Sequence, residues 1–149
     1  MRALEKTSLD WVIQGDGKIA YTIYNNAVGQ YSYDKCVKEH YFAATTQDSN
    51  YKNLDYKKIL GVSMFSETNE PVNEINLFEV KPNTSKSHSK NREYKKIGTA
   101  LLNYIQNTYN QKPIYVISRD EAIDFYLKNN FKSINNYHDC PYLMYNMQG

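Results

Sequence analysis

Cysteine, tryptophan and long apolar runs are scarce in this sequence. Its 149 residues include two cysteines, Cys36 and Cys140, and one tryptophan. Two cysteines are too few for a disulfide framework, so we expect a reducing compartment that keeps them as thiols. No apolar run approaches the roughly 20 residues that a membrane span needs, which predicts a soluble protein with no membrane partner.

The N-terminal residues contain no apolar stretch followed by small residues, so they do not have the pattern of an export signal. We therefore expect a cytoplasmic protein. The length predicts a single domain over residues 1–149, because one hydrophobic core suffices at this size. The same argument disfavours a two-domain enzyme.

Positive charge is unevenly spread along the chain. The sequence has 18 Lys and Arg against 16 Asp and Glu, a net charge of +2. Residues 81–97 hold six basic side chains and one glutamate, so this segment alone carries +5. Such a segment attracts anions, although a run of charge often simply faces water. Both interpretations stay open at this point.

Hydrophobic periodicity predicts the elements of the second half of the chain. The strands predicted in this way span residues 58–66, 73–81, 114–117, 131–134 and 142–145. An apolar stripe of period 3.6 predicts a helix that begins near Ile97. A second helix has Ala122, Phe125 and Tyr126 on one face, with Ser118 or Asp120 as its cap.

The first half is less regular. We predict strands over residues 9–14 and 41–46, with mixed helix and loop over residues 18–39. The order of strands and helices predicts an α/β fold, in which helices flank a mixed β-sheet.

Several common site motifs are absent or incomplete. No phosphate-binding loop of the Gly-x4-Gly-Lys-Ser/Thr type occurs, which argues against a nucleoside triphosphatase. Residues 15–20 match part of a dinucleotide fingerprint, but no regular strand–helix–strand unit follows them. His138 and Cys140 lack metal-ligand spacing, so we expect a turn there and no metal site.

Two motifs lie at compatible spacing within residues 59–146. The first has the sequence LFEVKP over residues 77–82 and YKKIGTALL over residues 94–102; the second is AIDFYLKNNF over residues 122–131. Together they resemble the acyl-CoA signature and the second motif of the GNAT superfamily of N-acetyltransferases. The resemblance implies a GNAT-like mixed sheet, acetyl-CoA as co-substrate, no metal, and direct transfer of an acetyl group to an amine.

The resemblance also implies a location for the cofactor. Acetyl-CoA would insert where the strand that ends at Val80 splays from the strand that begins at Ile114. Backbone groups of the first strand would bind pantetheine, and N–H groups of residues 95–99 would hold the pyrophosphate. The cofactor-binding residues implied in this way are Phe78, Glu79, Val80, Tyr94, Lys95, Lys96, Ile97, Gly98, Thr99, Arg119 and Tyr126.

Two catalytic residues follow from the same resemblance. Tyr126 matches the tyrosine that protonates or hydrogen-bonds the departing thiolate. Glu74 lies six residues before Val80, where some members have a catalytic glutamate that takes the proton of the amine. Strict alternation places Glu74 on the same strand face as Phe78 and Val80. The alternatives are a Glu79 or water-chain base, an ordinary exposed Glu74, and a Tyr126 that only fills the core.

The sequence departs from the family pattern at three positions. Lys96 stands where the phosphate loop has its first glycine, Asn130 stands at the glycine before Phe131, and Arg119 stands where asparagine is frequent. Glycine is favoured where φ is positive or backbone approaches phosphate closely. We therefore expect a relaxed turn at Lys96, and a left-handed conformation at Asn130, which asparagine tolerates.

The acceptor is not identified by these motifs. A small molecule, a peptide or an aminoacyl-tRNA fits the expected chemistry, and a homodimer is one expected oligomeric state. The alternatives are a catalytically impaired GNAT-like protein that binds CoA or RNA, and an acetyltransferase toxin directed at tRNA.

Overall fold

The computed structural model describes residues 3, 6, 36–50, 52–81, 96–118, 122–134 and 143–146. Its centre is a six-stranded sheet in the order β1-β2-β3-β4-β6-β5. The strands are β1 (Cys36–Thr45), β2 (Ile59–Thr68), β3 (Asn73–Val80), β4 (Ile114–Ile117), β5 (Phe131–Ile134) and β6 (Leu143–Asn146). A short 3-10 helix, η1 (Tyr56–Lys58), precedes β2, and the two α-helices are α3 (Ile97–Thr108) and α4 (Ile123–Lys128).

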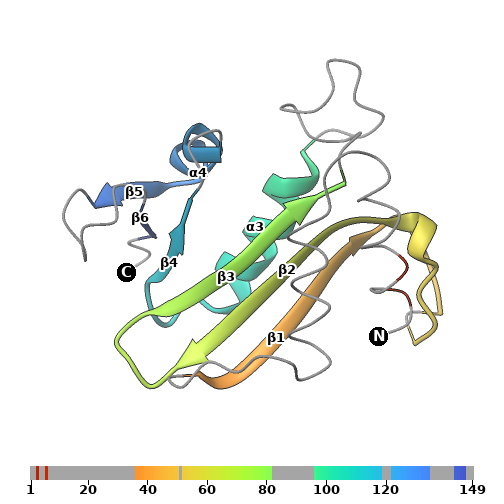
Figure 1. Cartoon of the computed structure of the whole chain (residues 1–149), viewed down its shortest axis with the longest axis horizontal. Coiled ribbons are helices and arrows are strands. Elements are labelled where there is room, and N and C mark those ends of the chain that lie inside the picture. Colours follow the sequence, from red (N-terminus) through yellow and green to blue (C-terminus); the bar gives the residue numbers. More distant parts are fainter. Residues whose placement is uncertain are drawn as a thin grey trace.

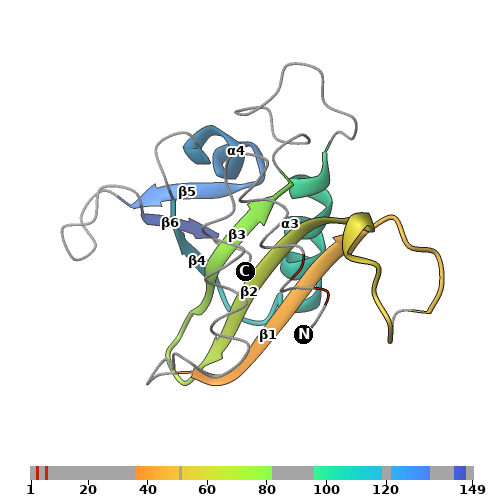
Figure 2. The same ribbon diagram turned by 45° about the vertical axis from the view of Figure 1, so that its right-hand side comes forward.

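The sheet is mixed. β3 and β4 pair in parallel, whereas every other neighbouring pair is antiparallel. Figures 1 and 2 show α3 crossing behind the long β1–β3 part of the sheet, with α4 beside the shorter strands. The predicted mixed α/β fold with flanking helices is therefore confirmed.

Both helices pack on one face of the sheet. The larger core cluster joins residues of β2, β3, β4 and β5 to Leu101, Leu102 and Ile105 of α3 and to Tyr126 of α4. The helical period of α3 explains this packing, because these α3 positions form a single apolar stripe. The opposite face carries a second cluster of Ile59, Val62 and Met64, with Ala3 packed against it. Ala3 therefore lies on the face away from the helices.

Most predicted elements of the second half are confirmed. The β4 and β5 bounds agree with the prediction, β6 lies one residue later, and β2 runs two residues further than expected. The prediction of mixed helix and loop is wrong for residues 36–39, which belong to β1 and pair with β2. Pairing with a neighbouring strand overrides the local pattern there. The strand predicted over residues 9–14 and the turn at 138–140 lie outside the described residues.

None of the helices in the described part of the chain is long and apolar enough to cross a membrane. In the same residues, no group of three or more His, Cys, Asp or Glu side chains is arranged to hold a metal ion.

Candidate active site

The parallel strands β3 and β4 separate at their carboxyl ends. They pair at three positions only, from Asn73 with Ile114 to Ile75 with Val116. β3 then continues for five residues to Val80 without β4 as its neighbour. Figure 1 shows the two strands close at one end and diverging toward the other. A strand whose pairing stops in this way offers its edge to an extended ligand.

A β-bulge at Asn76 reverses the faces of β3. The register with β2 passes from Ile75–Phe65 to Leu77–Met64, so Asn76 is an extra residue in the strand. As a result Ile75 and Phe78 both pack in the larger core cluster, on the helix side of the sheet. Leu77 packs in the cluster on the opposite face.

The bulge corrects the predicted position of Glu74. Glu74 alternates with Ile75, so its side chain lies on the face away from the helices, opposite to Phe78 rather than beside it. There its Oε1 accepts a hydrogen bond from the Tyr115 hydroxyl at 2.5 Å. Tyr115 sits between Ile114 and Val116 of β4, both of which point into the core. Sequence reasoning missed Tyr115 because its contact with Glu74 depends on strand pairing.

Helix α3 begins beside the end of β3 with a left-handed residue. Lys96 is the N-cap, with φ 62° and ψ 21°, and its side chain makes no cap hydrogen bond. The first helical hydrogen bond runs from the Ala100 N–H to the Lys96 carbonyl, so the N–H groups of residues 97–99 precede the helical ladder. The first turn contains no acidic residue. Its partial positive charge and the Lys96 ammonium therefore act together on an anion.

The expectation of a relaxed turn at Lys96 is wrong. The chain adopts the positive φ that the glycine of the family pattern would supply, and it does so with a side chain present. Asn130 likewise has a φ of 70°, which confirms the expected left-handed conformation. Both departures from glycine therefore retain the backbone geometry that glycine favours.

Gly98 lies between the end of β3 and helix α4. A Cβ atom at Gly98 would lie 3.1 Å from Phe125 Cε2 and Cζ and 3.5 Å from Val80 Cγ1. The position is therefore closed to larger side chains by Phe125, whose role the sequence did not indicate. Phe125 also lies 5.8 Å from Phe78, centroid to centroid, so aromatic rings line the approach from β3 to α4.

Helix α4 carries Tyr126 into the core. The predicted cap Ser118 is wrong, because the N-cap is Ala122, four residues later, and it makes no side-chain cap. The other predicted cap, Asp120, lies outside the described residues. Tyr126 is 5% exposed and contacts the rings of Phe78, Phe125 and Phe131. Burial raises the pKa of the Tyr126 phenol well above its ordinary value of 10. Its hydroxyl therefore stays protonated at neutral pH.

The ends of the two helices are joined beside this core. Gln106 of α3 donates from Nε2 to the Asn129 carbonyl at 3.0 Å, and Asn129 donates from Nδ2 to the Phe125 carbonyl at 2.8 Å. These bonds fix α4, and with it Phe125 and Tyr126, relative to α3.

The structure brings five of the eleven predicted cofactor residues together. Phe78, Val80, Lys96, Gly98 and Tyr126 converge where β3, α3 and α4 meet. Glu79 lies in register with Val62, whose side chain packs on the opposite face. Ile97 packs over Gly61 of β2, and Thr99 follows in the first turn of α3. Tyr94, Lys95, Asp120 and Arg119 lie outside the described residues.

Comparison with known proteins found similarity in structure only. No protein-family model matches the sequence, and a search of curated proteins found no relative. Tetrahymena GCN5 is similar over 72% of this chain and 68% of its own, at 16% identity and a TM-score of 0.47. The PaiA N-acetyltransferase of Thermoplasma acidophilum, in complex with coenzyme A, is similar over 62% of this chain at 18% identity and a TM-score of 0.44. This chain covers 56% of the PaiA chain, a little over half of its length.

The splay of β3 from β4 and the helix that begins beside the end of β3 are the arrangement that the sequence resemblance implies. The chain has a mixed α/β fold with both helices packed on one face of the sheet. The first turn of α3 also fits a phosphate-bearing ligand, because residues 96–99 present backbone N–H groups, a lysine and no carboxylate.

Proposed function

We propose that this protein is an N-acetyltransferase that uses acetyl-CoA and transfers the acetyl group directly to an amine. The observation that carries the proposal is the meeting of the splayed end of β3 with the N-terminus of α3, at Val80 and Gly98. A strand edge that can bind an extended ligand lies next to a helix N-terminus that can bind an anion. This pair suits a pantetheine arm joined to a pyrophosphate.

The cofactor would be held mainly by backbone. Phe78, Glu79 and Val80 lie beyond the last β3–β4 pair, so this stretch of β3 is suited to bond the pantetheine amides. The N–H groups of Ile97, Gly98 and Thr99 would bind the pyrophosphate, with the Lys96 ammonium adding charge. We extend the proposal to Tyr94, Lys95 and Arg119 on the sequence resemblance alone.

Glu74 is the proposed base. Acetyl-CoA supplies the acetyl group as a thioester, which only a neutral amine attacks, so a carboxylate must first take a proton from the ammonium form. Glu74 has one oxygen held by Tyr115 and lies on the face of the sheet away from the helices. Tyr115 would position this carboxylate and leave Glu74 Oε2 for the amine. The new C–N bond forms as the C–S bond breaks. The nitrogen then loses a second proton, which passes through solvent to the released thiolate and gives the free thiol of CoA.

Tyr126 is the proposed partner of the leaving group. An ordinary thiol has a pKa of about 8.5. Because burial raises the pKa of Tyr126 above that of a free phenol, proton transfer from Tyr126 to a thiolate is unfavourable. The raised pKa therefore supports hydrogen-bond donation to the sulfur rather than full protonation.

Calorimetry with CoA and a thiol-release assay across an amine panel test the proposal together. The panel should contain small amines, peptides and an aminoacyl-tRNA, because each fits the expected acceptor chemistry. We expect CoA binding by the wild type and thiol release with at least one amine. Absence of CoA binding would overturn the proposal, whereas binding without thiol release across the panel would support a catalytically impaired CoA-binding protein.

A further inference from the structure

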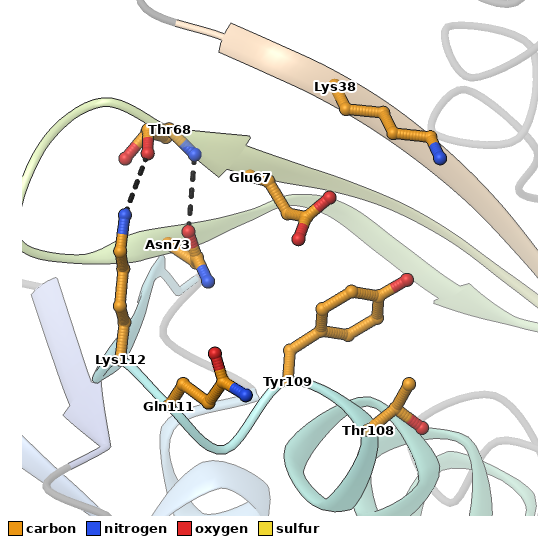
Figure 3. A pocket seen from close by; sticks show the side chains of 8 residues that line it. All are labelled: Lys38, Glu67, Thr68, Asn73, Thr108, Tyr109, Gln111 and Lys112. Atoms are coloured by element: carbon orange, nitrogen blue, oxygen red, sulfur yellow. Dashed lines mark hydrogen bonds between the residues drawn. The ribbon is translucent and has the colours of Figure 1, made fainter.

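A second cavity lies at the other end of the sheet. It has a volume of about 430 Å³ and is formed where β2 ends, β3 begins and α3 ends, as Figure 3 shows. This volume lies within the range of small-molecule sites. Asn73 lies seven residues before Val80, so the cavity is about 23 Å along β3 from the meeting of Val80 with Gly98, at about 3.3 Å per residue. The neighbouring Glu74 alternates with Asn73 and points to the opposite face of the sheet. The cavity is therefore distinct from the proposed cofactor site and opens on the other face from Glu74.

One wall of the cavity has a buried donor without an acceptor. Asn73 is 6% exposed, and its Oδ1 accepts from the Thr68 N–H at 3.2 Å. That bond fixes the amide orientation and leaves Nδ2 as a donor, for which no acceptor lies among the described residues. Figure 3 shows this nitrogen directed into the cavity. A buried donor left unpaired is costly, so the site favours a ligand with an acceptor oxygen here.

The same wall carries a positive charge. The Lys112 Nζ donates to the Thr68 carbonyl at 2.9 Å and to the Glu70 carbonyl at 3.3 Å, which holds the ammonium beside Asn73. A carboxylate is the acceptor group that best matches an amide donor next to an ammonium.

The facing wall is negatively charged. Glu67 uses Oε2 to bond His40 Nε2 at 2.7 Å, and the Tyr109 hydroxyl bonds His40 Nδ1 at 3.2 Å. With Tyr109 as donor, His40 carries its proton on Nε2 and donates it to Glu67, whose Oε1 is left for a ligand. Burial, and then the charge of Glu67, raise the pKa of Tyr109, so its hydroxyl stays protonated.

The end of helix α3 adds to this negative potential. Its last turn contains no basic residue, so the partial negative charge of its terminal carbonyls is not offset within the helix. Lys38 reaches the cavity from β1, but within the described residues the ion pair of Glu67 is with His40. The wall of Glu67 and Tyr109 therefore suits an ammonium group.

We propose that this cavity is a second binding site, which takes a small zwitterion of the α-amino-acid type. The ligand carboxylate bonds Asn73 Nδ2 beside Lys112, and the ligand ammonium pairs with Glu67 near Tyr109. The proposal does not depend on the acetyltransferase activity, because no residue of the cavity belongs to the proposed active site.

Binding of three matched probes to the full chain, without CoA, tests the charge pattern. The probes are L-leucine, 3-methylbutylamine, which lacks the carboxylate, and 4-methylpentanoate, which lacks the ammonium. We expect L-leucine to shift the amide resonances of residues 67–73 and 108–112. Each single-charge probe should bind about tenfold more weakly or worse, since a charged hydrogen bond is lost. No binding of L-leucine up to its solubility limit, or shifts confined to the splay, would overturn the proposal.

Two variants test the contacts. Asn73→Asp keeps the oxygen that Thr68 needs and replaces the donor by a second oxygen, so it should weaken L-leucine binding by about tenfold or more. Glu67→Gln keeps an acceptor for His40 but removes the charge, and should have a similar effect. Asp48→Asn, an exposed change of the same kind on the loop after β1, is the control and should bind as the wild type does.

Thermal unfolding first establishes that each variant is folded. If Asn73→Asp does not fold, Glu67→Gln alone decides the outcome. Wild-type affinity in a folded Glu67→Gln protein would overturn the proposal, as would equal affinity for L-leucine and both single-charge probes.

Discussion

The left-handed conformation of Lys96 gives a sharp prediction about stability. Lys96 has a φ of 62°, which costs an ordinary residue about 1–2 kcal/mol. Glycine avoids that cost but loses about 0.5–1 kcal/mol of extra chain entropy on folding. Lys96→Gly should therefore be more stable than Lys96→Ala by about 0.5–1 kcal/mol. Since both variants remove the ammonium from the helix N-terminus, their difference isolates the backbone.

Urea denaturation measures this difference directly. The midpoint should be higher for Lys96→Gly with an unchanged slope, and the melting temperature should rise by about 1–4 °C relative to Lys96→Ala. If Lys96 also neutralises phosphate, both variants should lose CoA affinity to the same extent. A Lys96→Ala protein as stable as Lys96→Gly would refute the left-handed assignment, and unequal CoA affinities would refute a purely electrostatic role for the side chain.

Four further predictions concern the proposed active site. Gly98→Val should destabilise the fold by about 1–3 kcal/mol and weaken CoA binding, because the valine side chain meets Phe125. Adding Phe125→Leu should restore part of the stability. A Gly98→Val protein with the same melting temperature as the wild type would contradict this packing. Tyr126→Phe should lower kcat by about 10- to 100-fold with little change in CoA affinity, since one hydrogen bond to a charged sulfur is lost. Because burial raises the pKa of Tyr126 in the folded state, the free energy of unfolding of the wild type should fall as pH rises above 10. Tyr126→Phe should lose less stability over the same pH range, as measured by urea denaturation. If the stabilities of the two proteins fall in parallel with pH, the phenol is not buried. Glu74→Gln should lower kcat by about 100-fold with little change in CoA affinity, with Tyr115→Phe intermediate. A Glu74→Gln protein with wild-type kcat would exclude Glu74 as the base.

Periodicity predicted the second half of the chain because its elements satisfy their own local patterns. The stripe of Leu101 and Ile105 on α3 faces the core as expected, and β4 is a short apolar run bounded by Pro113 and Ser118. In β1, by contrast, residues 36–39 have no strand pattern of their own. They form a strand because they pair with β2. This pairing is a long-range contact, which a local sequence pattern does not predict.

The motifs name residues that lie together, but they do not predict how these residues pack. Val80, Gly98 and Tyr126, all proposed cofactor residues, lie where β3, α3 and α4 meet. Phe125 closes the space at Gly98. The sequence predicts only that Phe125 lies on one face of a helix, because its contact with Gly98 depends on the angle between α3 and α4. The strain at Lys96 was also missed, since a lysine in that sequence does not itself indicate a positive φ.

The bulge at Asn76 is the least predictable feature and the one with most effect on the proposed chemistry. With strict alternation Glu74 would point toward Phe78, into the core beneath α3 and α4, where an acceptor amine could not reach it. The extra residue turns Glu74 to the opposite face while Phe78 still contacts Tyr126 from the helix side. The proposed base and the proposed thiolate partner therefore approach the splay from opposite faces of the sheet. In a direct transfer this separation lets the amine approach from one face while the sulfur leaves toward the other. The acceptor amine and the departing CoA thiolate therefore do not compete for the same space.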